Sequence, residues 1–192
     1  GQADWLVTVL SDGPSTEALL LGELDQRLAG RGIIQIATIA PEQSQALAAG
    51  VAERGGRYLE APVLGSKPEA LVGRLQLMAG GEPKVFAAAE PLLKQLSEAP
   101  RHLGPVGSAM ACKLALNQLI ASLTHAFSLS LHLVQRSGVD VESFMEILRG
   151  SALYAPTFDK KLERELQGDY ANPNFPTAHL RKDRSEEHTS EL

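Results

Sequence analysis

The chain has 192 residues, of which 44% are hydrophobic and 21% charged, a composition that suits a soluble globular protein of one or two domains. Its formal net charge of −5 leaves no basic surplus to meet phosphates, which argues against nucleic-acid binding. The single cysteine, Cys112, excludes an internal disulfide and a cysteine-based zinc site, and the five histidines lack metal-binding spacing, so we expect no metal.

The first hundred residues alternate between strand and helix signals. Short apolar runs predict four strands, near residues 5–10, 33–37, 57–63 and 75–81. Turn residues followed by apolar residues at helical spacing predict four helices between or after them, at 17–29, 41–54, 67–73 and 82–99. Strands without clean alternation, separated by helices, indicate a mostly parallel sheet covered on both faces. The expected fold class is therefore α/β, a partial doubly wound, Rossmann-like sheet.

Two details of these helices are also predicted. Ser15 or Thr16 is expected to cap the first helix, with Pro14 in its first turn. Pro91 is expected to kink or split the helix at 82–99.

After residue 103 no strand signal remains. Apolar residues at helical spacing predict a long helix from Ser108 to about Ser137, and shorter helices at 140–151 and 157–169. We therefore expect one domain over 1–103 and a partial all-α domain over 104–183. The apolar run at 114–134 is long enough to span a membrane, but its polar residues would be expensive in lipid, which favours a central helix of a soluble domain.

The last nine residues, "RSEEHTSEL", change composition abruptly. They match what one reading frame of a widely used sequencing-library adapter encodes, so we expect residues 184–192 to be a non-native tail and the native sequence to stop at Asp183. A genuine acidic, disordered tail is the alternative.

Lys113 and Asn117 lie four residues apart in the long helix and therefore share one of its faces. Two structural interpretations are open: Lys113 extends its amine from a partly exposed first turn, or the polar stripe bonds to a neighbouring loop. The catalytic interpretation is that burial lowers the pKa of the Lys113 amine, so that it can exchange a proton near neutral pH. The preceding loop, "GPVGS", brings a helix N-terminus whose free N–H groups favour an anion such as a carboxylate.

Five segments together resemble the β-hydroxyacid dehydrogenases, the 3-hydroxyisobutyrate dehydrogenase-like family, and within it the glyoxylate/succinic semialdehyde reductase branch. In chain order they are "ADWLVTVLSDGPSTEALLLG", "IIQIATIAPEQSQALA", "GGRYLEAPVLGSKPEALVGRLQLMAGG", "GPVGSAMACKLALNQ" and "NPNFPTAHLRKD". The resemblance covers nearly all of residues 3–183. It implies that residues 1–103 are the C-terminal part of a dinucleotide-binding domain, and that residues 104–183 belong to an all-α catalytic and oligomerisation domain.

The resemblance also implies roles for single residues. Lys113 becomes the general acid and base that protonates the substrate carbonyl oxygen as hydride arrives, and Asn117 holds the substrate oxygen or the amine. The backbone N–H groups of Gly65 and Ser66 bind the substrate carboxylate. The cofactor, NADP or NAD, is contacted by Leu10, Ser11, Thr38 and Lys182.

The implied activity is NAD(P)-dependent reduction of a short aldehyde acid, glyoxylate or succinic semialdehyde, to its hydroxy acid. Leu64 stands where the family signature has serine, so substrate identity stays open. In the family, the position that separates NAD from NADP belongs to the first part of the nucleotide domain, which we expect this chain to lack, so the choice of cofactor stays open too. The chain contains no G-x-G-x-x-G, the motif that binds the pyrophosphate. We therefore expect a fragment that lacks the N-terminal part of the nucleotide domain and the end of the helical domain, and that is inactive by itself.

Two alternatives remain. One is a 3-hydroxyisobutyrate or tartronate semialdehyde dehydrogenase of the same family, and the other is a non-catalytic scaffold member. For the reductase and for the alternative dehydrogenase alike, the expected partner is a small-molecule substrate rather than nucleic acid or membrane. The full-length protein is expected to be a cytoplasmic homodimer or homotetramer.

Overall fold

The computed structural model describes residues 3–169 together with Ala171, Arg181, Asp183 and Ser185. The described residues form two compact units, which divide between Ala115 and Leu116. The first unit also includes the described residues at positions 181, 183 and 185. Lys182, and the predicted non-native tail apart from Ser185, lie outside the described residues.

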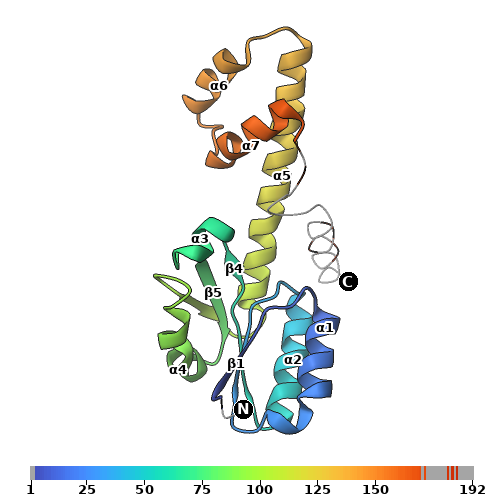
Figure 1. Ribbon diagram of the computed structural model, residues 1–192, viewed down its shortest axis with the longest axis vertical. Helices are drawn as coiled ribbons and strands as arrows, with labels where there is room; N and C mark the ends of the chain where they lie inside the picture. The colour runs from blue at the N-terminus through green and yellow to red at the C-terminus, as the bar shows by residue number, and fades with distance from the viewer. Residues whose placement is uncertain (1–2, 170, 172–180, 182, 184, 186–192) are drawn as a thin grey trace. The chain divides into compact units, whose positions relative to one another are not determined.

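The first unit is built on a mixed sheet of six strands (Figure 1). Strands β1, β2 and β3 are parallel neighbours, and β6 is parallel to β5, whereas β3 and β4 each pair with β5 in antiparallel fashion. The expected mostly parallel sheet is therefore confirmed. The strands are β1 (Trp5–Thr8), β2 (Gly32–Gln35), β3 (Arg57–Glu60), β4 (Val63–Leu64), β5 (Gln76–Gly81) and β6 (Arg101–Gly104).

Helices cover both faces of this sheet (Figure 1). Ile33 and Tyr58 point toward α1 and α2 and belong to one core cluster with Leu20 and Leu47, whereas Ile34 and Leu59 point toward α4. Successive residues of a strand face opposite sides, so strands buried on both faces have no alternating pattern of polar residues. The helical segments of this part are α1 (Gly13–Glu17), η1 (Ala18–Glu23), η2 (Asp25–Arg27), α2 (Pro41–Glu53), α3 (Lys67–Leu71) and α4 (Pro83–Leu93).

Three sequence predictions needed correction in this unit. The first helix begins at Gly13, because the Asp12 carboxylate accepts the Ser15 N–H at 2.8 Å and caps the helix in place of Ser15 or Thr16. The helix predicted at 82–99 is shorter, because α4 ends at Leu93. Pro91 lies inside α4 and does not split it. Strand β6 was missed, because its four residues carry neither an apolar run nor an alternating pattern and are identified only by their pairing with β5.

Helix α5 (Ser108–Arg136) is a single element of 29 residues, and the division between the two units falls within it. Among the described helices it is long and apolar enough to cross a membrane. Its N-terminal part buries Met110 in the core of the first unit, and its later turns bury Phe127 and Leu131 in the core of the second. These contacts favour a core helix of a folded protein.

The second unit is helical. Phe127 of α5 stacks on Phe158 with ring centroids 4.9 Å apart, and Met145 completes the same buried cluster. Two further helices supply these partners, α6 (Val141–Arg149) and α7 (Pro156–Gln167).

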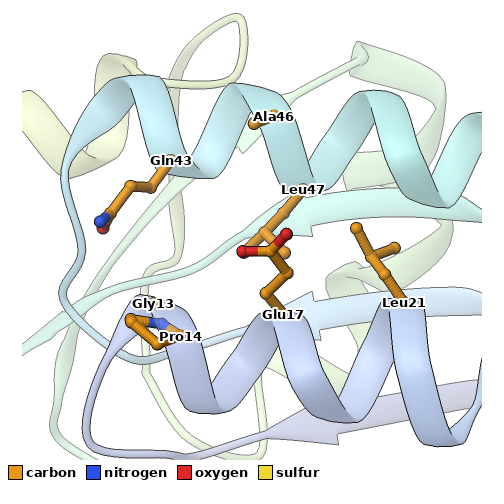
Figure 2. Close-up of a pocket in the computed structure, with 7 residues that line it drawn as sticks. All are labelled: Gly13, Pro14, Glu17, Leu21, Gln43, Ala46 and Leu47. Carbon is orange, nitrogen blue, oxygen red and sulfur yellow. The ribbon is translucent and has the colours of Figure 1, made fainter.

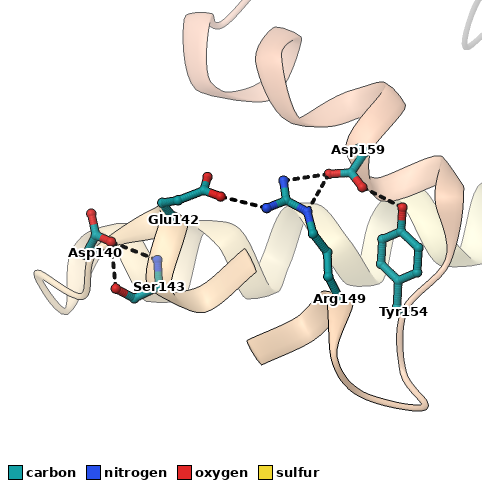
Figure 3. Close-up of polar contacts among 6 residues, drawn as sticks. All are labelled: Asp140, Glu142, Ser143, Arg149, Tyr154 and Asp159. Carbon is teal, nitrogen blue, oxygen red and sulfur yellow. Dashed lines mark hydrogen bonds and ion pairs between the residues drawn. The ribbon is translucent and has the colours of Figure 1, made fainter. Parts of the chain in front are cut away.

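Charged side chains connect α6 to α7 at the surface of this unit. Arg149 bonds Glu142 at 2.7 Å and Asp159 at 2.8 Å, and Asp159 also accepts the Tyr154 hydroxyl (Figure 3). The Arg149 guanidinium and the Tyr154 hydroxyl hold the pKa of Asp159 below its usual value.

Candidate active site

Several predicted site residues follow the carboxyl ends of neighbouring strands. Leu10 and Ser11 come directly after β1, and Thr38 comes after β2. Gly65 and Ser66 follow β4, the short continuation of the chain beyond β3. In open α/β sheets, ligands bind at the carboxyl ends of the parallel strands.

The N-terminus of α5 lies at the same end of β3. Glu60, the last residue of β3, is 0% exposed, and its Oε1 accepts the backbone N–H groups of Ala109 at 2.8 Å and Met110 at 3.3 Å. Its Oε2 accepts the Ser44 hydroxyl of α2 at 2.6 Å. The buried carboxylate therefore joins one strand to the starts of two helices.

Sequence reasoning expected an anion such as a carboxylate at the α5 N-terminus but did not identify Glu60 as its source. The structure shows that Ser108 N–H bonds Pro105, Ala111 N–H bonds Gly107, and the two amides between them bond Glu60. The anion at this helix N-terminus is thus the protein's own side chain. An acidic residue directly after the apolar pair Tyr58 and Leu59, at the end of a predicted buried strand, was the signal that could have revealed it, because buried carboxylates need partners.

Lys113 lies one turn beyond these amides, still within the first unit. The side chain is half-buried, and burial lowers the pKa of its amine, while the charge of buried Asp183 acts in the opposite direction. Lys113 is therefore a cation that the protein partly removes from water, as the catalytic interpretation requires.

Asn117 follows one turn later on α5, and its side chain is only 2% exposed. Its position four residues after Lys113 places the two side chains on one face of the same helix. Buried amides are generally hydrogen-bonded, and a hydrogen-bonded amide suits a residue that is to position an oxygen or an amine.

Gly65 and Ser66 differ in what they can offer a substrate. Gly65 has a φ of 133°, and an added Cβ would stand 2.9 Å from Leu75 Cδ2, so the backbone requires glycine there. Ser66 donates both its N–H, at 2.7 Å, and its hydroxyl, at 2.8 Å, to Glu69 and thereby caps α3. A substrate carboxylate would have to displace Glu69 to bind either donor of Ser66.

A pocket of about 140 Å³ lies elsewhere, between α1 and α2 (Figure 2). None of the predicted site residues lines it. Gln43 of α2 and Gly13 of α1 both line it, and an added Cβ at Gly13 would meet Gln43 Oε1 at 2.7 Å. Its lining residues are Gly13, Pro14, Glu17, Leu21, Gln43, Ala46 and Leu47.

The residues after β1 and β2 fit one half of a nicotinamide dinucleotide. Val9 and Leu10 expose apolar surface beside the hydroxyl of Ser11, and Thr38 is half-buried after the next strand. Apolar side chains suit the face of a nicotinamide ring, and hydroxyls suit its ribose. Within the described part of the chain, no three metal-ligating side chains gather in one place.

Comparison with known proteins identifies the class to which this fold and site belong. Residues 1–117 match the model for the NAD-binding domain of 6-phosphogluconate dehydrogenase. Residues 107–186 match the model described as NAD-binding of NADP-dependent 3-hydroxyisobutyrate dehydrogenase. The cofactor class expected from the sequence, NADP or NAD, is thus confirmed.

Individual relatives agree with this class. Glyoxylate/succinic semialdehyde reductase 1 of Arabidopsis thaliana is 31% identical over 182 residues, which cover 93% of this chain and 63% of that protein. The 2-hydroxy-3-oxopropionate reductase of Escherichia coli is 31% identical over 185 residues, covering 94% and 63%. The solved structure of Mycobacterium tuberculosis 3-hydroxyisobutyrate dehydrogenase with L-serine has the same fold, with a TM-score of 0.87 at 21% identity, over 98% of this chain and 67% of that one.

The chain belongs to the β-hydroxyacid dehydrogenase family of NAD(P)-binding oxidoreductases. It spans about 63% of the length of the two reductases it matches.

Proposed function

We propose that the complete protein reduces a short aldehyde acid, glyoxylate or succinic semialdehyde, to the corresponding hydroxy acid, with Lys113 as general acid. The observation that carries this proposal is the placement of Lys113. Its half-buried amine lies one turn into a helix whose start is bonded to the carboxyl end of β3. The reductase relatives support the reaction type.

A bound NADPH or NADH supplies the hydride that reduces the aldehyde carbon. The residues of the chain manage the oxygen and the proton. As negative charge develops on the carbonyl oxygen, Lys113 Nζ donates its proton, so that an aldehyde, a hydride and a proton give an alcohol. Asn117 orients the oxygen or the amine from the next turn of α5.

The electrostatic surroundings of Lys113 suit this proton transfer. Burial disfavours the ammonium form and makes the proton easier to release, while the charge of Asp183 acts in the opposite direction and offsets this in part. The backbone N–H of Gly65 binds the substrate carboxylate. In the reverse direction the neutral amine accepts the proton from the alcohol.

The decisive experiment replaces Lys113 with Ala in the full-length protein. Loss of the proton donor should reduce kcat about 100- to 10,000-fold while the fold and cofactor affinity persist. The matched control is Lys84→Ala, which removes an exposed lysine of the same unit and should leave kcat unchanged. Equal turnover in wild type and Lys113→Ala would exclude the enzymatic role of Lys113 and favour the scaffold alternative.

A second substrate candidate is 2-hydroxy-3-oxopropionate, that is, tartronate semialdehyde. It is favoured by the Escherichia coli reductase, which is as similar to this chain as the Arabidopsis thaliana enzyme. The family signature has a serine hydroxyl where this chain has Leu64. Without that hydroxyl, substrates with fewer polar groups near this position are favoured. Comparing kcat/KM for the three aldehyde acids, each with NADPH and NADH, decides between the candidates.

We also propose that the full-length protein is a cytoplasmic homodimer or homotetramer. Large apolar side chains are exposed on the helical unit and would be covered by a second copy: Leu119, Leu129, Leu133, Ile147 and Leu153. Light scattering of the full-length protein measures this state directly.

A further inference from the structure

We propose that Glu60 is the positioning residue of this site: its buried carboxylate fixes the first turn of α5 against the sheet and thereby sets the location of Lys113. The inference rests on the proposed function only for its catalytic consequence. The positional claim itself can be measured without any substrate.

The first step of the argument is hydrogen-bond satisfaction. A helix begins with N–H groups that have no partner within the helix, and leaving such groups buried and unpaired destabilises the folded protein. Two of these groups in α5, at Ala109 and Met110, are buried and donate to Glu60. The acceptor of these two bonds comes from a distant part of the chain, since Glu60 precedes Ala109 by 49 residues.

The second step is that Glu60 is itself held from two other directions. Ser44 donates its hydroxyl to Oε2, and Tyr58 Oη lies 3.0 Å from Ser44 Oγ, within hydrogen-bond distance. Burial, with a further contribution from the Glu60 charge, raises the pKa of Tyr58, so its phenol stays protonated and can donate to Ser44. The carboxylate cannot move without breaking this chain of bonds.

The third step is the space left for the carboxylate on β5. Gly80 is paired with Glu60 across the sheet, and an added Cβ at Gly80 would stand 2.3 Å from Glu60 Oε1. The absence of a side chain at Gly80 therefore lets Oε1 reach the α5 amides. Four elements, β3, β5, α2 and α5, thus converge on a single carboxylate.

The consequence for Lys113 follows from helix geometry. Lys113 is four residues after Ala109, so a first turn that frays or shifts carries the amine with it. Shifts of about 1 Å in a catalytic group can cost 100-fold in rate. A negative charge at the helix N-terminus also stabilises the first turn through the helix dipole.

The test compares three variants of the full-length protein. Glu60→Ala leaves the two amides without an acceptor. Glu60→Gln keeps an oxygen that accepts from the two amides and offers an N–H₂ that can donate to Ser44, so it keeps the bonds to α5 without the charge and reverses the direction of the bond to Ser44. Gly80→Ala keeps the carboxylate but displaces it, and the flexible end of the Glu60 side chain can move without unfolding the protein.

The substrate-free readout is the acetylation rate of Lys113, measured by peptide mass spectrometry and divided by the rate of exposed Lys84. We expect this ratio to change at least threefold in Glu60→Ala and Gly80→Ala, and to stay within twofold of wild type in Glu60→Gln. The control is Gln35→Leu, which alters a buried polar side chain that is paired with Glu60 in the sheet and has no hydrogen-bond partner among the described residues, and it should leave the ratio unchanged.

The kinetic readout separates positioning from mere stability. In Glu60→Ala, kcat per folded molecule should fall at least tenfold with a smaller change in KM, and Glu60→Gln should restore most of it. If Glu60→Ala does not fold, Gly80→Ala carries the same comparison.

An unchanged labelling ratio and unchanged kcat in both Glu60→Ala and Gly80→Ala would overturn the inference. Changed labelling in a protein without reductase activity would support the positional role and refute the proposed function. Loss of activity in Lys113→Ala, together with indifference to all Glu60 and Gly80 variants, would refute the positional role alone.

Discussion

At the scale of single residues, the role we propose for Lys113 comes with a cost in stability. Burial disfavours its charged form, and Asp183 offsets this only in part. The pKa of the Lys113 amine is therefore lower in the folded protein than in the unfolded chain. Below the folded pKa both states hold the proton, and the folded state bears the cost of burying it. As pH rises through the folded pKa, the folded state releases a proton that the unfolded state retains, and stability recovers.

Lys113→Met should therefore increase the free energy of unfolding at pH 7, by less than about 1 kcal/mol. The gain over wild type should shrink as pH approaches about 10, where an unperturbed lysine titrates. Urea denaturation of both proteins at several pH values measures this difference. Lys84→Met, at an exposed position, provides the control and should show no such trend. A gap between Lys113→Met and wild type that stays constant from pH 7 to 10 would contradict the assignment of a lowered pKa.

At the scale of elements, the contact between α6 and α7 depends partly on charge. Arg149 bridges Glu142 and Asp159, and all three side chains are substantially exposed, so the pairing contributes modestly and is screened by salt. The lowered pKa of Asp159 means that this contribution is present above the carboxyl's unfolded pKa and is lost as pH falls through its folded pKa.

Asp159→Asn should accordingly increase amide hydrogen exchange in α7 slightly at neutral pH, and the difference from wild type should disappear in acid or at 1 M salt. Hydrogen exchange followed by mass spectrometry of α7 peptides measures this. Glu163→Gln changes a carboxylate of the same helix that bonds Gln167 rather than an arginine, and it should have no comparable effect. A difference that persists in high salt would assign the role of Asp159 to packing.

At the scale of the whole molecule, we propose that the chain supplies residues for the nicotinamide half of the cofactor, but its sequence contains no G-x-G-x-x-G for the pyrophosphate. The isolated 192-residue polypeptide should therefore bind NADP⁺ and NAD⁺ at least 100-fold more weakly than the full-length protein, and should show no hydride transfer. Calorimetric titration of both polypeptides measures this. Equal affinity would show that the motif is not required for binding.

The fold of the first unit could be predicted where the pattern is local. Pro41 at the start of α2 and the apolar run of β2 identify those elements from their own residues. Strand β6 could not be found in this way, because its exposed and half-buried residues are ordered by pairing with β5, a distant segment. The cap at Asp12 was missed because several capping residues stand side by side in "SDGPST".

The sequence by itself determined the family, the alternation of strands and helices, and the pairing of Lys113 with Asn117 on one helix, because each depends on neighbours within a few residues. Only the tertiary structure decided what occupies the N-terminus of α5 and what Ser66 bonds. Glu60 and Ala109 meet across 49 residues of chain, and Glu69 satisfies the donors that a substrate was expected to use. Hydrogen bonds between elements depend on which distant segments the tertiary fold brings together. A pattern of neighbouring residues does not show which segments those are.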